Sequence, residues 1–204
     1  IPRQKELLLP ERHLGLVQAQ EIDSLERKIQ TYAKLIKNNI NLDEIIDIAK
    51  SNFFTIKNDD IIPPPAQRIS LASDKAFSFI YPHILDNWKK SGVEIKPFSP
   101  LNNEVPDKDA DLIWLPGGYP ELYAKELSEA NLTRNALHKL SKDVKIHGEC
   151  GGYMSLGEAL VDKNGNIFKM FGLLGLVSSY EKRKLHLGYR TAKIRTKNTG
   201  RWIS

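Results

Sequence analysis

The sequence predicts an α/β fold: a doubly wound, mostly parallel sheet over residues 63–204, preceded by a helical segment over residues 1–62. In the second part, short apolar strands alternate with amphipathic helices, an order that builds β-α-β units. The first part shows helical periodicity alone. Between them stands Pro63-Pro64-Pro65, a run that neither a helix nor a central strand accommodates. We therefore place a domain boundary between residues 62 and 63.

The first part contains two predicted helices. Apolar residues recur at three- and four-residue steps from Ile22 to Ile36, and Asn39 marks the expected end of this helix. Asn41 is in position to cap a second helix over residues 42–49. The polar stretch 51–60 then leads into the prolines, which favour a stiff, extended segment.

The second part contains predicted strands and helices in alternation. Gly92 ends the first of its helices. The third strand is nearly all apolar, as expected for a strand covered on both faces. The predicted strands span residues 68–72, 93–98, 111–115 and 144–147, and the predicted helices span 82–91, 121–128, 133–142 and 152–160.

Beyond residue 160 the pattern changes to hairpins. The pair Asn164-Gly165 predicts a two-residue hairpin turn. Residues 185–196 are predicted to form a long strand.

The composition is that of an ordinary soluble globular protein, with 204 residues, 41% hydrophobic and 27% charged. No apolar run approaches the roughly 18–20 residues that span a bilayer, and the first residues do not form a signal peptide. The net charge of +5 is scattered, without interleaved aromatic residues, which argues against a nucleic-acid partner. A single cysteine excludes an internal disulfide and fits a reducing, cytoplasmic compartment. Because no methionine opens the chain, we expect it to be a piece of a longer protein.

The segment Gly148-Glu149-Cys150-Gly151-Gly152 carries the strongest chemical signal. It follows an apolar strand with the spacing of a nucleophile elbow, with cysteine in place of serine. In such a turn a strained backbone projects the nucleophile, and the residues two positions away must be small because they pack together. The start of a helix favours the reactive thiolate, and the Gly151 N–H is placed to bond an oxyanion. The alternative, a cysteine buried as a small hydrophobe, is disfavoured by the flanking glycines.

A second glycine pair, Gly117-Gly118, follows the third predicted strand directly. Ligands of open α/β sheets bind at the carboxyl ends of strands, so this turn and the cysteine elbow are expected to lie side by side. Two glycines let backbone N–H groups approach a substrate closely and supply the second half of an oxyanion hole. A simple strand-to-helix turn, with Pro120 at the first helical position, is the alternative.

Together these motifs resemble the class I, triad-type glutamine amidotransferase domain, and more narrowly the CobB/CobQ-like cobyrinic acid a,c-diamide synthase family of cobalamin biosynthesis. The resemblance is carried by Gly117-Gly118-Tyr119-Pro120-Glu121 and Gly148-Glu149-Cys150-Gly151-Gly152-Tyr153-Met154. It extends over nearly the whole chain through Leu9-Pro10-Glu11-Arg12-His13-Leu14-Gly15-Leu16, Asp74-Lys75-Ala76-Phe77-Ser78-Phe79-Ile80-Tyr81-Pro82, Pro97-Phe98-Ser99-Pro100 and Leu187-Gly188-Tyr189-Arg190.

The resemblance implies glutamine hydrolysis at Cys150 through a thioester. The ammonia released would amidate the a and c carboxylates of a corrinoid, cobyrinate or hydrogenobyrinate, in an ATP-dependent synthetase domain. Gly118 and Gly151 would be the oxyanion donors. Gly117, Tyr119 and Glu121 would lie next to the glutamine pocket. Residues 1–62 would be the tail of the synthetase domain, and residues 63–204 a glutaminase domain cut short at its C-terminal end.

This sequence departs from the family pattern at both ends. The catalytic histidine of the family follows the Leu-Gly-Tyr-Arg strand and is expected beyond Ser204. The phosphate-binding loop of the synthetase is absent, so we expect ATP and Mg²⁺ to bind in the full-length enzyme and outside this fragment, which would be inactive alone. Four histidines are expected to be solvated or packed: His83, His138, His147 and His186. His13 belongs to the motif of the synthetase tail, where a positional or substrate-facing role is the hypothesis, and none of the five is expected to form a metal site. A cobyric acid synthase-type amidotransferase and a non-catalytic α/β binding module are the alternatives.

Overall fold

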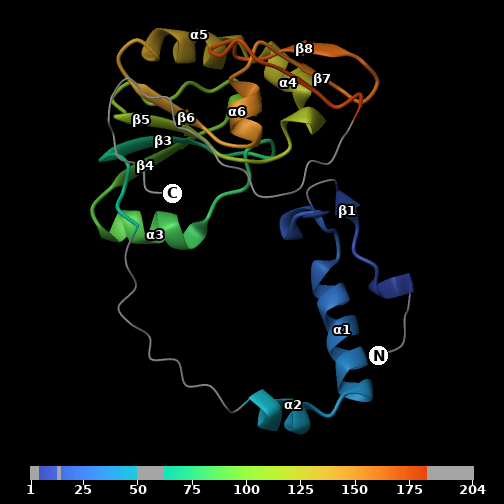
Figure 1. The fold of residues 1–204 in the computed structure, drawn as a ribbon. Coiled ribbons are helices and arrows are strands. Elements are labelled where there is room, and N and C mark those ends of the chain that lie inside the picture. Colours follow the sequence, from blue (N-terminus) through green and yellow to red (C-terminus); the bar gives the residue numbers. More distant parts are fainter. Residues whose placement is uncertain (1–4, 13–14, 50–61, 183–204) are drawn as a thin grey trace, which may run out of the picture. The chain divides into compact units, whose positions relative to one another are not determined.

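The computed structural model describes residues 5–12, 15–49 and 62–182 (Figure 1). The chain divides into two compact units, Ile1–Asp59 and Asp60–Ser204. Among the described residues, no helix has the length and apolar character needed to cross a membrane.

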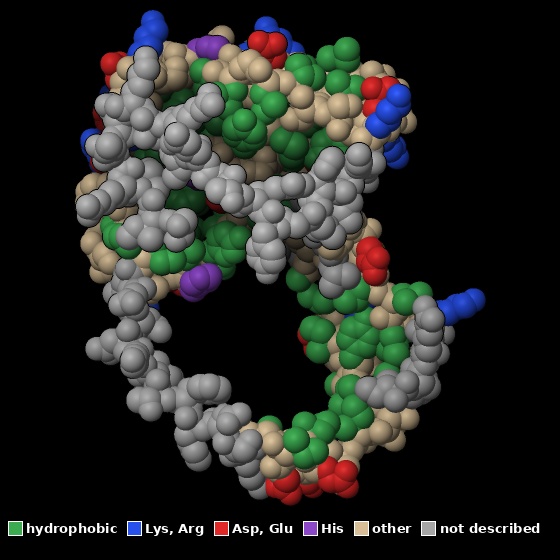
Figure 2. All heavy atoms as spheres, viewed as in Figure 1, with side chains coloured by type: hydrophobic (Ala, Val, Ile, Leu, Met, Phe, Trp, Pro, Cys, Tyr) green, Lys and Arg blue, Asp and Glu red, His purple; other side chains and the backbone are tan. Residues whose placement is uncertain are grey.

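The first unit is built mainly from two amphipathic helices, α1 (Leu25–Asn39) and α2 (Leu42–Ala49). The Asn41 side chain accepts a hydrogen bond from the Asp43 N–H at 3.1 Å, so the predicted cap is confirmed. Neither helix buries a residue, and Figure 2 shows hydrophobic side chains at the surface of both. The shorter elements of this unit are η1 (Lys5–Leu7), β1 (Glu11–Arg12), β2 (Gly15–Leu16) and η2 (Ala19–Glu21).

The second unit contains a parallel sheet with the strand order β4-β3-β5-β6, which confirms the predicted α/β class. The order places the first strand of the sheet next to the third in sequence, so the connections diverge between β3 and β5. The crevice at the carboxyl ends of these two strands is where open α/β sheets bind ligands. The four strands are β3 (Arg68–Ala72), β4 (Glu94–Phe98), β5 (Leu112–Leu115) and β6 (Lys145–Gly148).

Helices cover both faces of this sheet, as the doubly wound prediction requires (Figure 1). On one face, Trp88 of α3 (Pro82–Lys90) packs with Ile69 and Leu112 of the sheet. On the other, a larger core joins Leu127 and Leu137 to the opposite side of the strands. The helices of that face are α4 (Ala124–Glu129), α5 (Asn131–Leu140) and α6 (Gly151–Ser155), and the short turns η3 (Pro100–Asn102) and η4 (Pro120–Leu122) precede α4.

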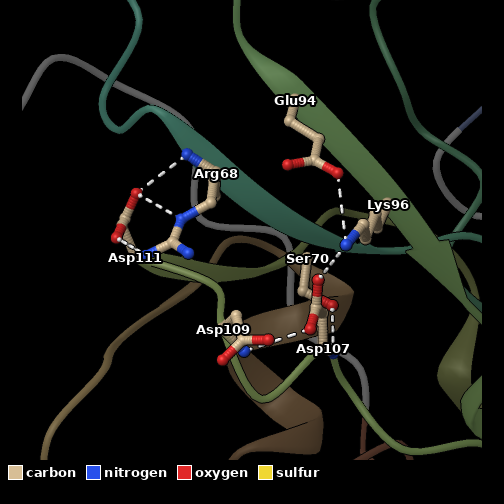
Figure 3. Close-up of polar contacts among 7 residues, drawn as sticks. All are labelled: Arg68, Ser70, Glu94, Lys96, Asp107, Asp109 and Asp111. Atoms are coloured by element: carbon tan, nitrogen blue, oxygen red, sulfur yellow. Dashed lines mark hydrogen bonds and ion pairs between the residues drawn. The ribbon is translucent and has the colours of Figure 1, made fainter.

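Charged side chains fasten the strands near their amino ends (Figure 3). The Arg68 guanidinium lies 2.9 Å from the Asp111 carboxylate, and Lys96 lies 2.8 Å from Asp107. Hydrogen bonds from these cations hold the pKa of both carboxyls below the ordinary value. This polar cluster lies toward the amino ends of the strands, away from the glycine turns that follow β5 and β6.

Arg134 on α5 is an internal tie. Only 7% of the residue is exposed, and burial lowers the pKa of its guanidinium. Its donors reach the backbone oxygens of Met170 at 3.0 Å and Ser128 at 2.8 Å and the side chain of Asn131 at 2.6 Å. The residue thereby joins α4 and α5 to the segment that follows β8.

The predicted helix over residues 152–160 is wrong beyond its first turn. Helix α6 ends at Ser155, and β7 (Ala159–Val161) pairs antiparallel with β8 (Ile167–Lys169) and parallel with β9 (Val177–Ser179). A Cβ at Gly157 would lie 2.6 Å from the Leu176 carbonyl oxygen, so this backbone approaches the chain before β9 closely. Pairing with residues distant in sequence overrides the local helical pattern.

The hairpin predicted at Asn164-Gly165 is present, but its turn is longer than the predicted two residues. Strands β7 and β8 form the hairpin, but its connection spans residues 162–166. The Asp162 carboxylate accepts from the N–H groups of Asn164 at 2.8 Å and Asn166 at 2.9 Å, which stabilises the longer loop. The predicted strand 185–196 lies outside the described residues.

A substitution at Gly152 tests the packing of α6 on the sheet. A Cβ there would collide with the backbone carbonyl of Leu115, which a strand cannot move aside. We expect Gly152→Ala to lower the free energy of unfolding by about 1–3 kcal/mol, measured by urea denaturation. Gly175→Ala is the matched control, because its Cβ would meet only Glu158 Oε1 at 3.9 Å. Equal stability of the two variants would contradict this packing.

Candidate active site

Cys150 occupies a strained turn between β6 and α6, as the sequence predicts. It is the N-cap of the helix, with φ 47° and ψ −113°. A positive φ in a residue other than glycine is costly and persists only where the surrounding structure enforces it. The cysteine is exposed, so the turn presents the thiol to solvent.

The glycines on either side explain how this conformation is enforced. A Cβ at Gly148 would lie 2.6 Å from Leu156 Cδ1 and 3.0 Å from the Gly152 carbonyl carbon. Gly148 and Gly152, which lie two positions before and after Cys150, therefore pack directly on each other. A side chain at Gly148 would crowd Leu156 and the Gly152 carbonyl, and one at Gly152 would collide with the Leu115 carbonyl.

The glycine turn after β5 lies beside the cysteine, which confirms the predicted juxtaposition. Strands β5 and β6 are parallel neighbours, with Leu115 opposite Gly148. A Cβ on Gly117 would lie 3.3 Å from Cys150 Cβ, and one on Gly151 would lie 3.0 Å from both the nitrogen and the oxygen of Gly118. Side chains at Gly117 and Gly151 would crowd the two backbones.

The two turns that meet beside the cysteine each carry a glycine N–H group. Within the described part of the chain, the N–H groups of Gly118 and Gly151 donate to no acceptor, whereas the neighbouring Gly152 N–H donates to the Glu149 carbonyl at 2.8 Å. Gly118 and Gly151 come from two different turns that meet at one place. This arrangement can stabilise negative charge on an oxygen bonded to a carbon that the thiol attacks.

Tyr119 and Glu121 continue the turn after β5. Tyr119 is only 2% exposed, and its ring meets that of Phe79 edge to face with centroids 5.1 Å apart. The Glu121 carboxylate oxygens are buried, on the short turn η4. Contact of either side chain with glutamine remains a prediction.

Each histidine in the described ranges contacts other groups of the protein. His147 meets the Trp114 ring edge to face at 4.9 Å, and its Nε2 lies 3.8 Å from Glu149 Oε2. His138 Nε2 lies 2.7 Å from the Phe171 carbonyl oxygen, and His83 contacts the Tyr81 ring. His13 and His186 lie outside the described residues. In the described ranges no group of three histidine, cysteine, aspartate or glutamate side chains could hold a metal ion.

Sequence reasoning noted the loop after β3 as part of the family resemblance but missed its contact with the site. Phe79 flanks the same glycine as the cysteine, since a Cβ on Gly117 would lie 3.1 Å from Phe79 Cδ2. The signal was present, because this loop begins with Asp74 shortly after an apolar strand. Its consequence depends on contacts between loops that only the fold brings together.

Removal of the cysteine side chain in two ways measures the backbone strain. Both Cys150→Gly and Cys150→Ala delete the thiol, but only glycine adopts a φ of 47° without a steric penalty. We expect Cys150→Gly to have the higher free energy of unfolding by about 1 kcal/mol, measured by urea denaturation. An alanine variant that is the more stable of the two would show that the turn is unstrained.

Comparison with known proteins connects this site to a family. Residues 68–203 match the model of the CobB/CobQ-like glutamine amidotransferase domain. Three proteins named hydrogenobyrinate a,c-diamide synthase are similar over nearly the whole chain. The protein of Rhodobacter capsulatus is 48% identical over 194 residues, which are 95% of this chain and 44% of that protein. Those of Mesorhizobium japonicum and Agrobacterium fabrum are each 46% identical, over 96% and 94% of this chain and 45% and 44% of theirs.

The chain thus spans less than half the length of these relatives. Among solved structures, a putative peptidase E protein from Listeria monocytogenes aligns with a TM-score of 0.40 and 10% identity, over 65% of this chain and 69% of that one. The family match extends from the first strand of the parallel sheet through the cysteine turn and beyond it. This chain belongs to the CobB/CobQ-like glutamine amidotransferase family.

Proposed function

We propose that this chain is the glutaminase portion of an ATP-dependent hydrogenobyrinate or cobyrinate a,c-diamide synthase. It would hydrolyse glutamine at Cys150 and supply ammonia for amidation of the a and c carboxylates of a corrinoid. The observation that carries the glutaminase half is the exposed, strained Cys150 on a turn that packs against a second glycine turn. The corrinoid half is supported by the names of relatives 46–48% identical to this chain.

The first chemical step is thiolate attack on the side-chain carboxamide carbon of glutamine. A C–S bond forms, and the carbonyl π electrons move to oxygen, where the N–H groups of Gly118 and Gly151 stabilise the charge as hydrogen-bond donors. Collapse of this intermediate breaks the C–N bond. The leaving nitrogen takes a proton and departs as ammonia, which leaves a glutamyl thioester on Cys150.

Water then completes the cycle. It adds to the thioester carbon, the same two N–H groups stabilise the second oxyanion, and the C–S bond breaks to give glutamate and the free thiol. The sum of the steps is glutamine plus water to glutamate plus ammonia. We propose that the base which moves these protons belongs to residues outside the described ranges, because His147 contacts Trp114 and Glu149 instead.

The first unit fits a role as part of a larger domain. Helices α1 and α2 are amphipathic and bury none of their residues within the described structure, so their apolar faces are available to pack against further protein. We assign residues 1–62 to the tail of the synthetase domain of the full-length enzyme. We propose that the full-length enzyme is located in the cytoplasm, where corrinoid and ATP would be available.

The described residues offer no site that fits ATP or Mg²⁺. The described ranges hold no cluster of metal-ligating side chains, and the sequence has no glycine-rich loop followed by lysine and serine or threonine. We place both in the rest of the full-length enzyme, and no step at Cys150 passes through them.

Cys150→Ser in the full-length protein tests the proposal. Hydroxyl is a far weaker nucleophile than thiolate, so glutamine-driven amidation of the corrinoid is expected to fall to background. Amidation driven by added ammonium chloride should persist near the wild-type rate, because that reaction bypasses the thiol. The amide products can be counted by mass spectrometry. Loss of both activities would mean that Cys150 is structural, and retention of both would remove it from catalysis.

A further inference from the structure

The carboxylate of Asp74, in the loop after β3, accepts three hydrogen bonds. One oxygen accepts from the Ala76 N–H at 2.9 Å. The other accepts from the Ser99 hydroxyl at 3.0 Å and the Leu101 N–H at 2.9 Å. The side chain therefore ties the loop after β3 to the turn after β4, at the carboxyl edge of the sheet.

The Asp74 backbone closes the same loop. Its carbonyl accepts from the Phe77 N–H at 3.1 Å, and both Ala76 and Phe77 are fully buried. Both the side chain and the backbone of Asp74 thus accept hydrogen bonds from this short segment.

The loop in turn packs on the glycine pair beside the thiol. A Cβ on Gly118 would collide with the Ala76 carbonyl oxygen and would lie 3.1 Å from the Phe77 Cα. Further along, the Phe79 N–H donates to the Gly117 carbonyl oxygen at 3.0 Å. The loop therefore contacts both glycines through backbone atoms.

The hydrogen bond from the Phe79 N–H to the Gly117 carbonyl also sets the direction of the Gly118 N–H. The Gly117 carbonyl and the Gly118 N–H belong to one planar trans peptide, in which they point to opposite sides. When the loop holds the carbonyl, it turns the N–H of Gly118 away from Phe79. A Cβ on Gly151 would lie 3.0 Å from the Gly118 nitrogen, so this N–H lies beside the cysteine turn.

We propose that Asp74 is a positioning residue for acyl transfer at Cys150. It fixes the loop of residues 74–79, which fixes the Gly117–Gly118 peptide plane and thereby directs the Gly118 N–H at the oxyanion. This inference rests on the proposed glutaminase function. It gives the segment Asp74-Lys75-Ala76-Phe77-Ser78-Phe79 a supporting role outside the chemical steps at Cys150.

Asp74→Asn is the sharpest variant because it preserves shape. The three neighbouring donors require acceptors, and an amide nitrogen in place of one oxygen turns a donor toward a donor. At least one of the bonds to Ala76 or Leu101 is then lost. Asp86→Asn is the matched control: it removes the same charge from an exposed position on α3.

Two rates at Cys150 in the full-length protein separate positioning from folding. Acylation by an activated γ-ester of glutamate, whose alcohol leaves in place of ammonia, develops an oxyanion, whereas alkylation by iodoacetamide displaces iodide at a tetrahedral carbon and develops none. We expect Asp74→Asn to slow acylation by roughly 10- to 100-fold, a partial loss of one oxyanion donor. Alkylation should stay close to the wild-type rate, and Asp86→Asn should alter neither.

Ser99→Ala deletes one bond to the same carboxylate and should slow acylation alone, to a smaller extent. It covers the case in which Asp74→Asn does not fold. Equal decreases in both rates, or acylation unchanged by Asp74→Asn, would overturn the proposal.

The backbone amide signal of Gly118 in ¹H–¹⁵N NMR gives a readout without catalysis. It is expected to shift in Asp74→Asn and to stay in place in Asp86→Asn, and an unshifted signal overturns the positioning role. If the ester fails to acylate even the wild-type cysteine, the proposed glutaminase function fails, and this signal still decides the role of Asp74.

Discussion

The close approach of two backbone turns is the constraint on which the rest of the site depends. Gly152 packs on the carbonyl of Leu115, and Gly151 packs on Gly118, so the turn after β6 rests directly on the turn after β5. No side chain fits between them. This contact holds Cys150 at its positive φ and brings N–H groups from two different turns to one thiol. Strain at Cys150 is thus balanced by packing next to it.

The topology of the sheet makes this contact possible. The order β4-β3-β5-β6 aligns four carboxyl ends along one edge, and three of the connecting loops contribute to the site. The loop after β3 buttresses the glycine pair, the loop after β5 supplies it, and the loop after β6 supplies the thiol. The remaining strand, β4, contributes indirectly, because the turn that follows it binds the Asp74 carboxylate. The opposite edge is held by ion pairs between charged side chains.

The sequence predicts those features that are local. Apolar runs located the four strands, and the spacing of Gly148, Cys150 and Gly152 located the turn, because its steric demands fall on immediate neighbours. It failed at β7, where pairing with β8 and β9 replaced a helical pattern. The hydrogen bonds of Asp74 could not be predicted either, since its partners Ser99 and Leu101 come from another loop. The roles assigned to Tyr119 and Glu121 rest on family resemblance alone.

Direct detection of the acyl-enzyme tests the central claim that Cys150 is the residue to which glutamine transfers its acyl group. Full-length protein mixed with glutamine can be quenched in acid within the first turnovers and digested for mass spectrometry. The account predicts a glutamyl adduct on the peptide that contains Cys150 and on no other peptide. Ammonia release from glutamine with this peptide unmodified, or an adduct on a different residue, would contradict it.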